Sequence, residues 1–217
     1  ITSLNDLEAV DYTFDEILVS GAARLLVGED DTLTLNENGH LTIEEHDLAS
    51  VTVAENGVFN NAGTIELPGI ENTLNIDGEL NNFPGSLVRY TGIFNSDQNG
   101  YVLNDFDYYN MAINAPGNIF FWNAGKIYNI NGQLEITGEP DNLITLRSTE
   151  DGTPWNLLLT DEPGYAEYVD VMDSHAHMGK GVRVGPLTDK AWELSINSGN
   201  NINWIFGVSQ GTIFVFY

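Results

Sequence analysis

The sequence contains no cysteine and few cationic side chains, with 7 lysine and arginine residues against 32 aspartate and glutamate residues. Without cysteine the chain can form neither disulfide bonds nor thiolate metal sites. The formal net charge is −25, so the field around the molecule repels phosphate backbones and anionic membrane surfaces. We therefore expect no nucleic-acid partner.

Long apolar runs and helical periodicity are also scarce. No apolar run reaches the 18 residues that a membrane-spanning helix needs, so we expect no membrane insertion. Helical spacing is limited to short stretches such as "SGAARLLV". The chain nevertheless has 217 residues, of which 42% are hydrophobic and 11% aromatic, which is enough for one folded domain with a core.

Two-residue alternation recurs along the chain and predicts an all-β fold. Leu33 and Leu35 share one face of a predicted strand, as do Ile65 and Leu67 of another. Turn signals separate the strands, at Asn38-Gly39, Asn56-Gly57, Asp77-Gly78 and Asn131-Gly132. These pairs fit both antiparallel hairpins and the corners of a parallel coil, so they do not decide between the two.

A repeated pair of asparagines favours the coil. "GVFNNAGTIEL" at 57–67 is followed by "GELNNFPGSLV" at 78–88, and a repeat of about 20 residues is typical of solenoids. Asparagine tolerates left-handed backbone geometry, and its amide can bond to an identical amide stacked above it. We expect structural corners at Asn60, Asn61, Asn81 and Asn82, with successive pairs about 5 Å apart.

Four later segments resemble large bacterial cell-surface and adhesin-like proteins built on right-handed parallel β-helices. The segments are "DYYNMAINAPGNIFFWNAGKIYNINGQLEITG" (107–138), "NLITLRSTEDGTPWNL" (142–157), "YVDVMDSHAHMGKGV" (168–182) and "SGNNINWIF" (198–206). They follow the order of a tyrosine-asparagine strand, an I-x-L-x-S strand, a V-x-D-S-x-A strand and a closing Gly-Asn-Asn-x-x-Trp-x-Phe. These motifs mark turns of a coil and not active sites.

The resemblance implies a right-handed parallel β-helix over residues 28–206 with extended terminal segments. Residues 1–27 are expected to be an N-terminal cap or interaction segment, and residues 207–217 a C-terminal apolar strand. The resemblance also implies a secreted protein, outside the cell or on its surface. We expect no catalytic residues, because fold alone does not license an enzyme.

The C-terminal sequence "GTIFVFY" is apolar on both faces of a strand. These residues form a candidate assembly interface: Ile213, Phe214, Val215, Phe216 and Tyr217. An uncharged strand of this kind, free of proline, is an aggregation hazard when it is exposed. It either caps the coil within its own chain or adds to a sheet edge of another copy. The second choice makes the partner the protein itself, joined head to tail.

Clustered carboxylates are weak candidates for calcium ligands, because hard cations prefer oxygen. The candidates are Asp30, Asp31, Asp97, Asp105 and Asp107. Solvated turns explain the same residues without a metal. No cofactor is required, and Ca²⁺ is the ion that we consider.

"DVMDSHAHMGKG" is the densest cluster of chemically active side chains. On a strand, Asp173, His175 and His177 share one face and offer a transition-metal site. The opposite, inward face then holds Ser174, Ala176 and Met178. Lys180 and Arg183 beside Asp170 and Asp173 are the plausible machinery of a polysaccharide lyase or hydrolase.

Three functions follow from these patterns. The preferred one is a non-catalytic structural subunit of an extracellular filament or surface layer, which assembles by strand addition of a terminal segment. The second is an adhesin-type module that binds glycan or a surface through exposed aromatic rings. The aromatic candidates are Tyr101, Phe106, Tyr108, Tyr109, Phe121 and Trp122, most of which should be core. The third is a β-helix lyase or hydrolase.

Overall fold

The computed structural model describes residues 11–44, 49–68, 73–92, 101–103, 106–185 and 194–207. Strands β1 to β22 form the ordered elements, and the paired strands are all parallel. The predicted all-β parallel β-helix is therefore confirmed. Within the described residues there is no helix with the length and apolarity to cross a membrane.

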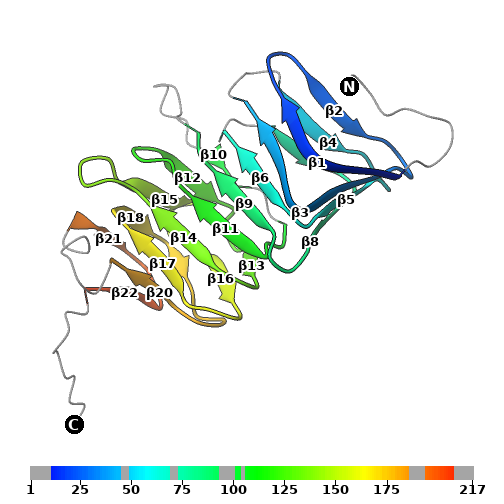
Figure 1. The fold of residues 1–217 in the computed structure, drawn as a ribbon. Helices are drawn as coiled ribbons and strands as arrows, with labels where there is room; N and C mark the ends of the chain where they lie inside the picture. Colours follow the sequence, from blue (N-terminus) through cyan, green and yellow to red (C-terminus); the bar gives the residue numbers. More distant parts are fainter. Residues whose placement is uncertain are drawn as a thin grey trace, which may run out of the picture.

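One sheet, here called the long sheet, runs the whole length of the coil (Figure 1). Its strands are β1 (Asp11–Val19), β3 (Thr32–Ile43), β6 (Thr64–Leu67), β9 (Leu87–Tyr90), β11 (Asn110–Ile113), β14 (Leu134–Thr137), β17 (Gly164–Glu167), β20 (Val182–Val184) and β22 (Trp204–Phe206). The first halves of β1 and β3 bend away and continue through β5 (Val58–Asn61) and β8 (Glu79–Asn82) as a second face.

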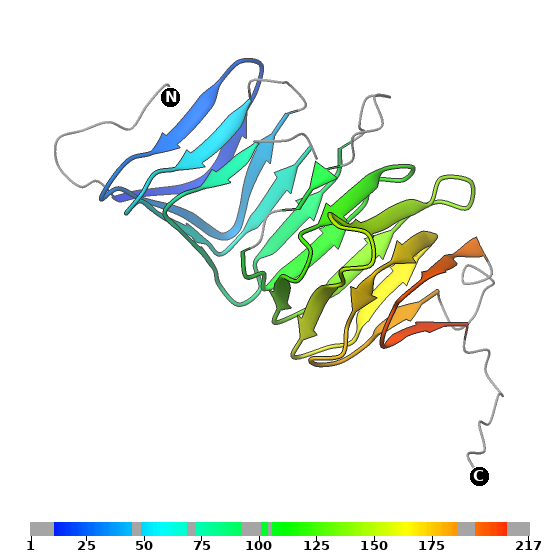
Figure 2. The same ribbon diagram turned by 180° about the vertical axis from the view of Figure 1, so that it is seen from behind.

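Shorter sheets complete the coil, which is seen from the other side in Figure 2. One contains β2 (Arg24–Val27), β4 (Ser50–Val53) and β7 (Leu74–Ile76). Another contains β10 (Tyr101–Val102), β12 (Ile119–Trp122), β15 (Ile144–Ser148), β18 (Val169–Met172) and β21 (Ile196–Gly199). The last contains β13 (Ile127–Ile130), β16 (Trp155–Leu159) and β19 (Ser174–His175).

Alternate residues of each strand fill the interior of the coil. Because the strands pair in register, side chains of the same orientation form columns along the axis. One inward column of the long sheet consists of Ile17, Leu41, Ile65, Val88, Met111, Leu134, Gly164, Val182 and Trp204. From Leu41 to Leu134 these side chains are at most 2% exposed, so burial of apolar surface along this column stabilises every turn.

Asparagine and glycine have different structural roles at the corners. Asn38 and Asn56 have φ values of 58° and 61°, whereas the glycines that follow them do not have positive φ. A Cβ on Gly57 would lie 2.6 Å from the carbonyl oxygen of Gly28, and one on Gly78 would lie 2.3 Å from that of Gly57. Asparagine therefore supplies the left-handed turn, and glycine permits the close approach of successive turns.

The stacked coil begins earlier than the sequence indicates. The predicted boundary lies at residue 28, whereas β1 pairs with β3 from Asp11 onward and β2 pairs with β4 from Arg24 onward. Residues 11–27 thus form the first described turn. The physical reason lies in "YTFDEILV", where the two-residue alternation changes phase at Asp15 because the strand bends there.

Large aromatic rings fill the C-terminal half of the interior. The rings of Trp122 and Trp155 stack at a centroid distance of 4.2 Å, and the ring of Tyr128 lies nearly perpendicular to that of Trp122 at a centroid distance of 4.7 Å. Nearer the middle of the coil, the hydroxyls of Tyr90 and Tyr108 share a buried hydrogen bond of 2.8 Å. Burial, together with the neighbouring tyrosines, raises the pKa of Tyr90 well above its usual value.

Candidate functional site

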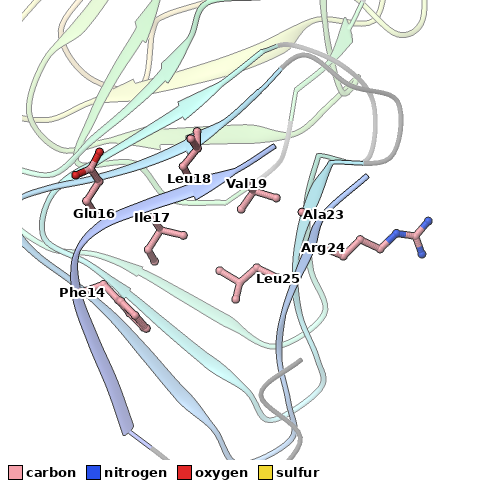
Figure 3. A pocket seen from close by; sticks show the side chains of 8 residues that line it. All are labelled: Phe14, Glu16, Ile17, Leu18, Val19, Ala23, Arg24 and Leu25. Carbon is pink, nitrogen blue, oxygen red and sulfur yellow. The ribbon is translucent and has the colours of Figure 1, made fainter. Parts of the chain in front are cut away.

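The first turn leaves the interior of the coil open among the described residues. A cavity of about 190 Å³ is lined by Phe14, Glu16, Ile17, Leu18, Val19, Ala23, Arg24 and Leu25. Figure 3 shows Phe14, Ile17 and Leu25 pointing into the space between β1 and β2, whereas Arg24 points away from it. The cavity is therefore an apolar mouth with charged side chains at its rim.

Near the bend of β1, inward side chains are less covered than their register partners, whereas Val19, Leu25 and Val27 of the same turn are buried. Phe14 and Ile17 are half-buried, whereas their partners Leu35 and Leu41 are fully buried. Leu18 points outward and is 58% exposed. Within the described part of the chain, β1 pairs on one side only, with β3, and β2 pairs only with β4. The first turn thus presents strand edges and apolar surface together.

The opposite end of the coil has the same character. Strand β22 is the last strand of the long sheet, and β21 is the last strand of its own sheet, in the part of the chain that the structure describes. Trp204 points inward and is 8% exposed, whereas Ile205 points outward and is 41% exposed. Ile196 and Ile202 are also exposed at this end. The predicted assembly residues Ile213, Phe214, Val215, Phe216 and Tyr217 lie outside the described residues.

A groove crosses the outer face of the long sheet. One hollow of about 520 Å³ is lined by Thr64, Gly85, Leu87, Arg89, Asn110, Met111, Ala112, Asn114, Gln133 and Glu135. A second, of about 420 Å³, is lined by Gln133, Leu134, Glu135, Glu162, Pro163, Gly164, Tyr165 and Arg183. Gln133 and Glu135 line both hollows, so the two hollows adjoin at strand β14.

The floor of this groove is small and its walls are polar. Ala112 is 5% exposed although it faces outward, between its register partners Arg89 and Glu135. Arg89 donates to Glu66 Oε1 at 2.9 Å, and the hydroxyl of Tyr165 donates to Glu167 at 3.1 Å. The groove therefore offers fixed hydrogen-bonding groups along the axis of the coil. It resembles a site for a long polar ligand more than a compact pocket.

The paired asparagines lie at the ends of β5 and β8, one pair directly above the other. Asn60 is the register partner of Asn81, and Asn61 is the partner of Asn82. Asn81 Nδ2 donates to Asn60 Oδ1 at 3.1 Å, and Asn61 Nδ2 donates to Asn82 Oδ1 at 2.8 Å. Asn61 is fully buried and also accepts a bond from the backbone N–H of Gly63. This ladder is part of the scaffold.

Asp170 and Asp173 have structural partners. Asp170 forms an ion pair with Arg147 at 2.5 Å and accepts a bond from Ser198. Asp173 has a φ of 58°, is 2% exposed, and accepts bonds from Gly152 N and Asn200 Nδ2. Both carboxylates therefore tie neighbouring turns together.

The rest of the predicted cluster is dispersed. Lys180 donates to the backbone carbonyl of Asp161, and Arg183 faces the groove on the long sheet. The rings of His175 and His177 lie 5.5 Å apart. Among the described residues, no group of three or more histidine, aspartate or glutamate side chains is placed to hold a metal ion.

The predicted inward face of the same segment is correct for two residues and wrong for one. Ser174 and Ala176 are fully buried, whereas Met178 is 44% exposed. The strand β19 ends at His175 and a turn follows, so the alternation does not extend to Met178.

The described calcium candidates also have local roles. Asp31 is 2% exposed and its carboxylate accepts a bond from Gly28 N at 3.2 Å. Asp30 has a φ of 63° in the same turn, and Asp107 accepts a bond from Asn129 Nδ2 at 2.6 Å. Asp97 and Asp105 lie outside the described residues.

Three of the six aromatic candidates are core, and Phe106 is half-buried and packs against the core. Tyr101, Tyr108 and Trp122 are at most 2% exposed. A role for Trp122 in stacking against a sugar is therefore wrong, because its ring is enclosed by Tyr128 and Trp155. Tyr109 and Phe121 are half-buried and keep accessible surface.

Sequence reasoning missed both hollow regions. A signal for the open first turn was available in "YTFDEILV", since its phase shift separates two short inward-facing pairs. The groove had no such signal, because its lining residues come from strands far apart in the sequence. In comparisons with known proteins, no family model, curated protein or solved structure matches the chain.

Proposed function

We propose that this protein is a non-catalytic structural subunit that assembles head to tail, outside the cell or on its surface, into a filament or surface layer. The contact is β-strand addition of the C-terminal segment, residues 213–217, to the first turn of the next copy. The extracellular location rests on the resemblance to bacterial surface proteins.

The observation that carries the proposal is the open first turn. Strand edges of β1 and β2 border an apolar cavity of about 190 Å³, and an uncovered sheet edge is a ready template for another strand. Addition of a strand there supplies backbone hydrogen bonds and covers apolar side chains that line the cavity. The C-terminal segment fits this role because it alternates large apolar side chains and carries no charged side chain.

The geometry of such a contact leads to a polymer. The donor segment and the acceptor turn are different surfaces of the chain, so each subunit that uses one still offers the other. Head-to-tail contacts that do not close into a ring generate open filaments. If the C-terminal segment instead paired with the first turn of its own chain, the protein would remain a capped monomer.

Deletion of residues 207–217 tests the proposal. Sedimentation velocity of the full chain should show species much larger than the monomer, and the deletion variant should remain monomeric. Circular dichroism checks that the deletion variant keeps its β structure. A matched pair of substitutions, Phe214→Lys in the segment and Ile127→Lys on mid-coil strand β13, separates loss of the donor from a general effect of added charge. A deletion variant that assembles like the full chain would contradict the proposal.

The groove favours a second function, an adhesin-type module that binds a glycan chain. Amide, carboxylate and guanidinium groups along the groove suit sugar hydroxyls, and Tyr165 offers a ring. Screening on immobilised glycans should give binding that Arg89→Ala weakens and Arg24→Ala, which lies outside the groove, does not. Equal binding by both variants, or none by the parent protein, would remove this alternative.

A further inference from the structure

The outward side chains of the long sheet form a register column with apolar residues at both ends. In order, the column is Leu18, Thr42, Glu66, Arg89, Ala112, Glu135, Tyr165, Arg183 and Ile205. Leu18 is 58% and Ile205 is 41% exposed. Between them only Ala112 is aliphatic, and it is nearly buried. Exposed aliphatic side chains in this column thus coincide with its two terminal strands.

The inward columns of the long sheet also have apolar side chains at both ends. Ile17 and Val19 face the interior at the first turn, and Trp204 and Phe206 face it at the last described turn. If β22 were followed by one more strand in register, Trp204 would meet the position of Ile17 and Phe206 that of Val19. Ile17 and Phe206, which are half-buried, would then be covered by apolar side chains of the other end.

The hydrogen-bonding edges are complementary as well. All strands of the long sheet run parallel, so the edge of β22 that no described strand pairs with is equivalent to the edge that β20 presents to β22. The edge of β1 that no described strand pairs with is likewise equivalent to the edge that β3 presents to β1. Within the sheet, each strand pairs with the next through one edge of each kind, so the outer edges of β22 and β1 can pair with each other in the same way.

We propose that β22 of one copy pairs in parallel register with β1 of a second copy, which makes the long sheet continuous across the junction, with Ile205 beside Leu18. This inference rests on the proposed function and adds a second strand pair, β22 with β1, to the contact between subunits. The edge of β2 in the same first turn is left for residues 213–217. Such a junction is heterologous and repeats by translation along the coil.

Cysteine cross-linking tests the junction directly, because the chain has no cysteine of its own. The double variant Leu18→Cys/Ile205→Cys of the full chain is oxidised under assembly conditions and analysed on a non-reducing gel. Neighbouring strands place Cα atoms about 4.8 Å apart, within the disulfide range of about 4.4–6.8 Å. Within one chain the two positions are about 38 Å apart, at eight strand spacings, so an intramolecular bond is excluded.

A ladder of dimers, trimers and larger species that disappears on reduction is the expected result. The control Ile127→Cys/Ile205→Cys, which places one thiol on mid-coil strand β13, should give no such ladder. If the double variant assembles by sedimentation but forms no ladder, or if the control cross-links equally, the β22–β1 junction is wrong while assembly stands. If the unsubstituted chain does not assemble, both the junction and the proposed function fail.

Discussion

At the scale of single residues, the asparagine ladder stabilises the fold through hydrogen bonds, some of which are buried. Asn61 is fully buried, donates to Asn82 and accepts from Gly63 N. Its amide thus satisfies a backbone group at the bend between β5 and β6. Asn60 is half-buried, and its amide oxygen accepts a hydrogen bond from Asn81 Nδ2 at 3.1 Å.

Asn61→Ala should therefore destabilise the fold more than Asn60→Ala. The first substitution leaves buried polar partners without a bond, which costs about 1–3 kcal/mol. The second removes one partly exposed bond, with a net loss of about 0.5–1.5 kcal/mol. Urea unfolding followed by circular dichroism measures both. Equal losses would mean that burial of the ladder is unimportant.

Tyr90 gives the fold a dependence on high pH. Its pKa is raised by burial and by Tyr108 and other neighbouring tyrosines, so the unfolded chain, with a tyrosine pKa of about 10, loses the proton first. The contribution to stability is complete below pH 10 and is lost as pH rises toward the folded pKa.

Tyr90→Phe should make the unfolding free energy less dependent on pH above 10. The difference in slope approaches about 1.4 kcal/mol per pH unit for one proton. Below pH 10 the variant is less stable, because the 2.8 Å bond to Tyr108 is lost. Urea unfolding at several pH values between 8 and 11 measures both effects, and parallel curves for the two proteins would contradict this role.

At the scale of strands, the coil has two halves whose described strands pair with each other only within the long sheet. The sheet of β2, β4 and β7 ends before the sheet of β10, β12, β15, β18 and β21 begins, and β8 does not pair with β13. Strands β9 and β11 connect the halves in register. Solenoid stability is approximately a sum over neighbouring turns, so the halves need not unfold together.

Trp155→Ala should expose this division. The substitution removes the ring that stacks on Trp122 at 4.2 Å, and loss of a buried tryptophan costs about 3–5 kcal/mol. Hydrogen exchange read by mass spectrometry should show lost protection in β12 to β18, with protection in β3 and β6 retained. Uniform loss along the whole chain would show that the halves form one cooperative unit.

The alternation within strands and the asparagine and glycine residues at the corners made the fold class predictable. They did not predict which strands lie at the ends of the coil. Leu33 and Leu35 or Ile65 and Leu67 share a face because period two is local, and the asparagine repeat indicates stacking. Whether a strand lies at an edge depends on its neighbours in space. The exposure of Ile205 therefore had no local signal, nor did the groove between distant strands, whereas the phase shift before Ile17 was a local signal of the bend in the first turn.

At the scale of the molecule, charge opposes assembly. Each chain carries a formal net charge of −25, so subunits that stack end to end repel one another. Salt screens such repulsion over about 10 Å at 0.1 M, whereas the proposed contact is apolar. Assembly followed by light scattering should therefore increase between low and moderate sodium chloride concentration. A decrease would indicate a contact made by opposite charges.

Electron microscopy of the full-length chain under conditions of assembly gives the most direct test. Nine strands of the long sheet at about 4.8 Å each set an axial repeat of about 43 Å if the coil continues from copy to copy. We predict unbranched filaments with this repeat. Separate particles of single-chain size at every concentration and salt tested would contradict head-to-tail assembly.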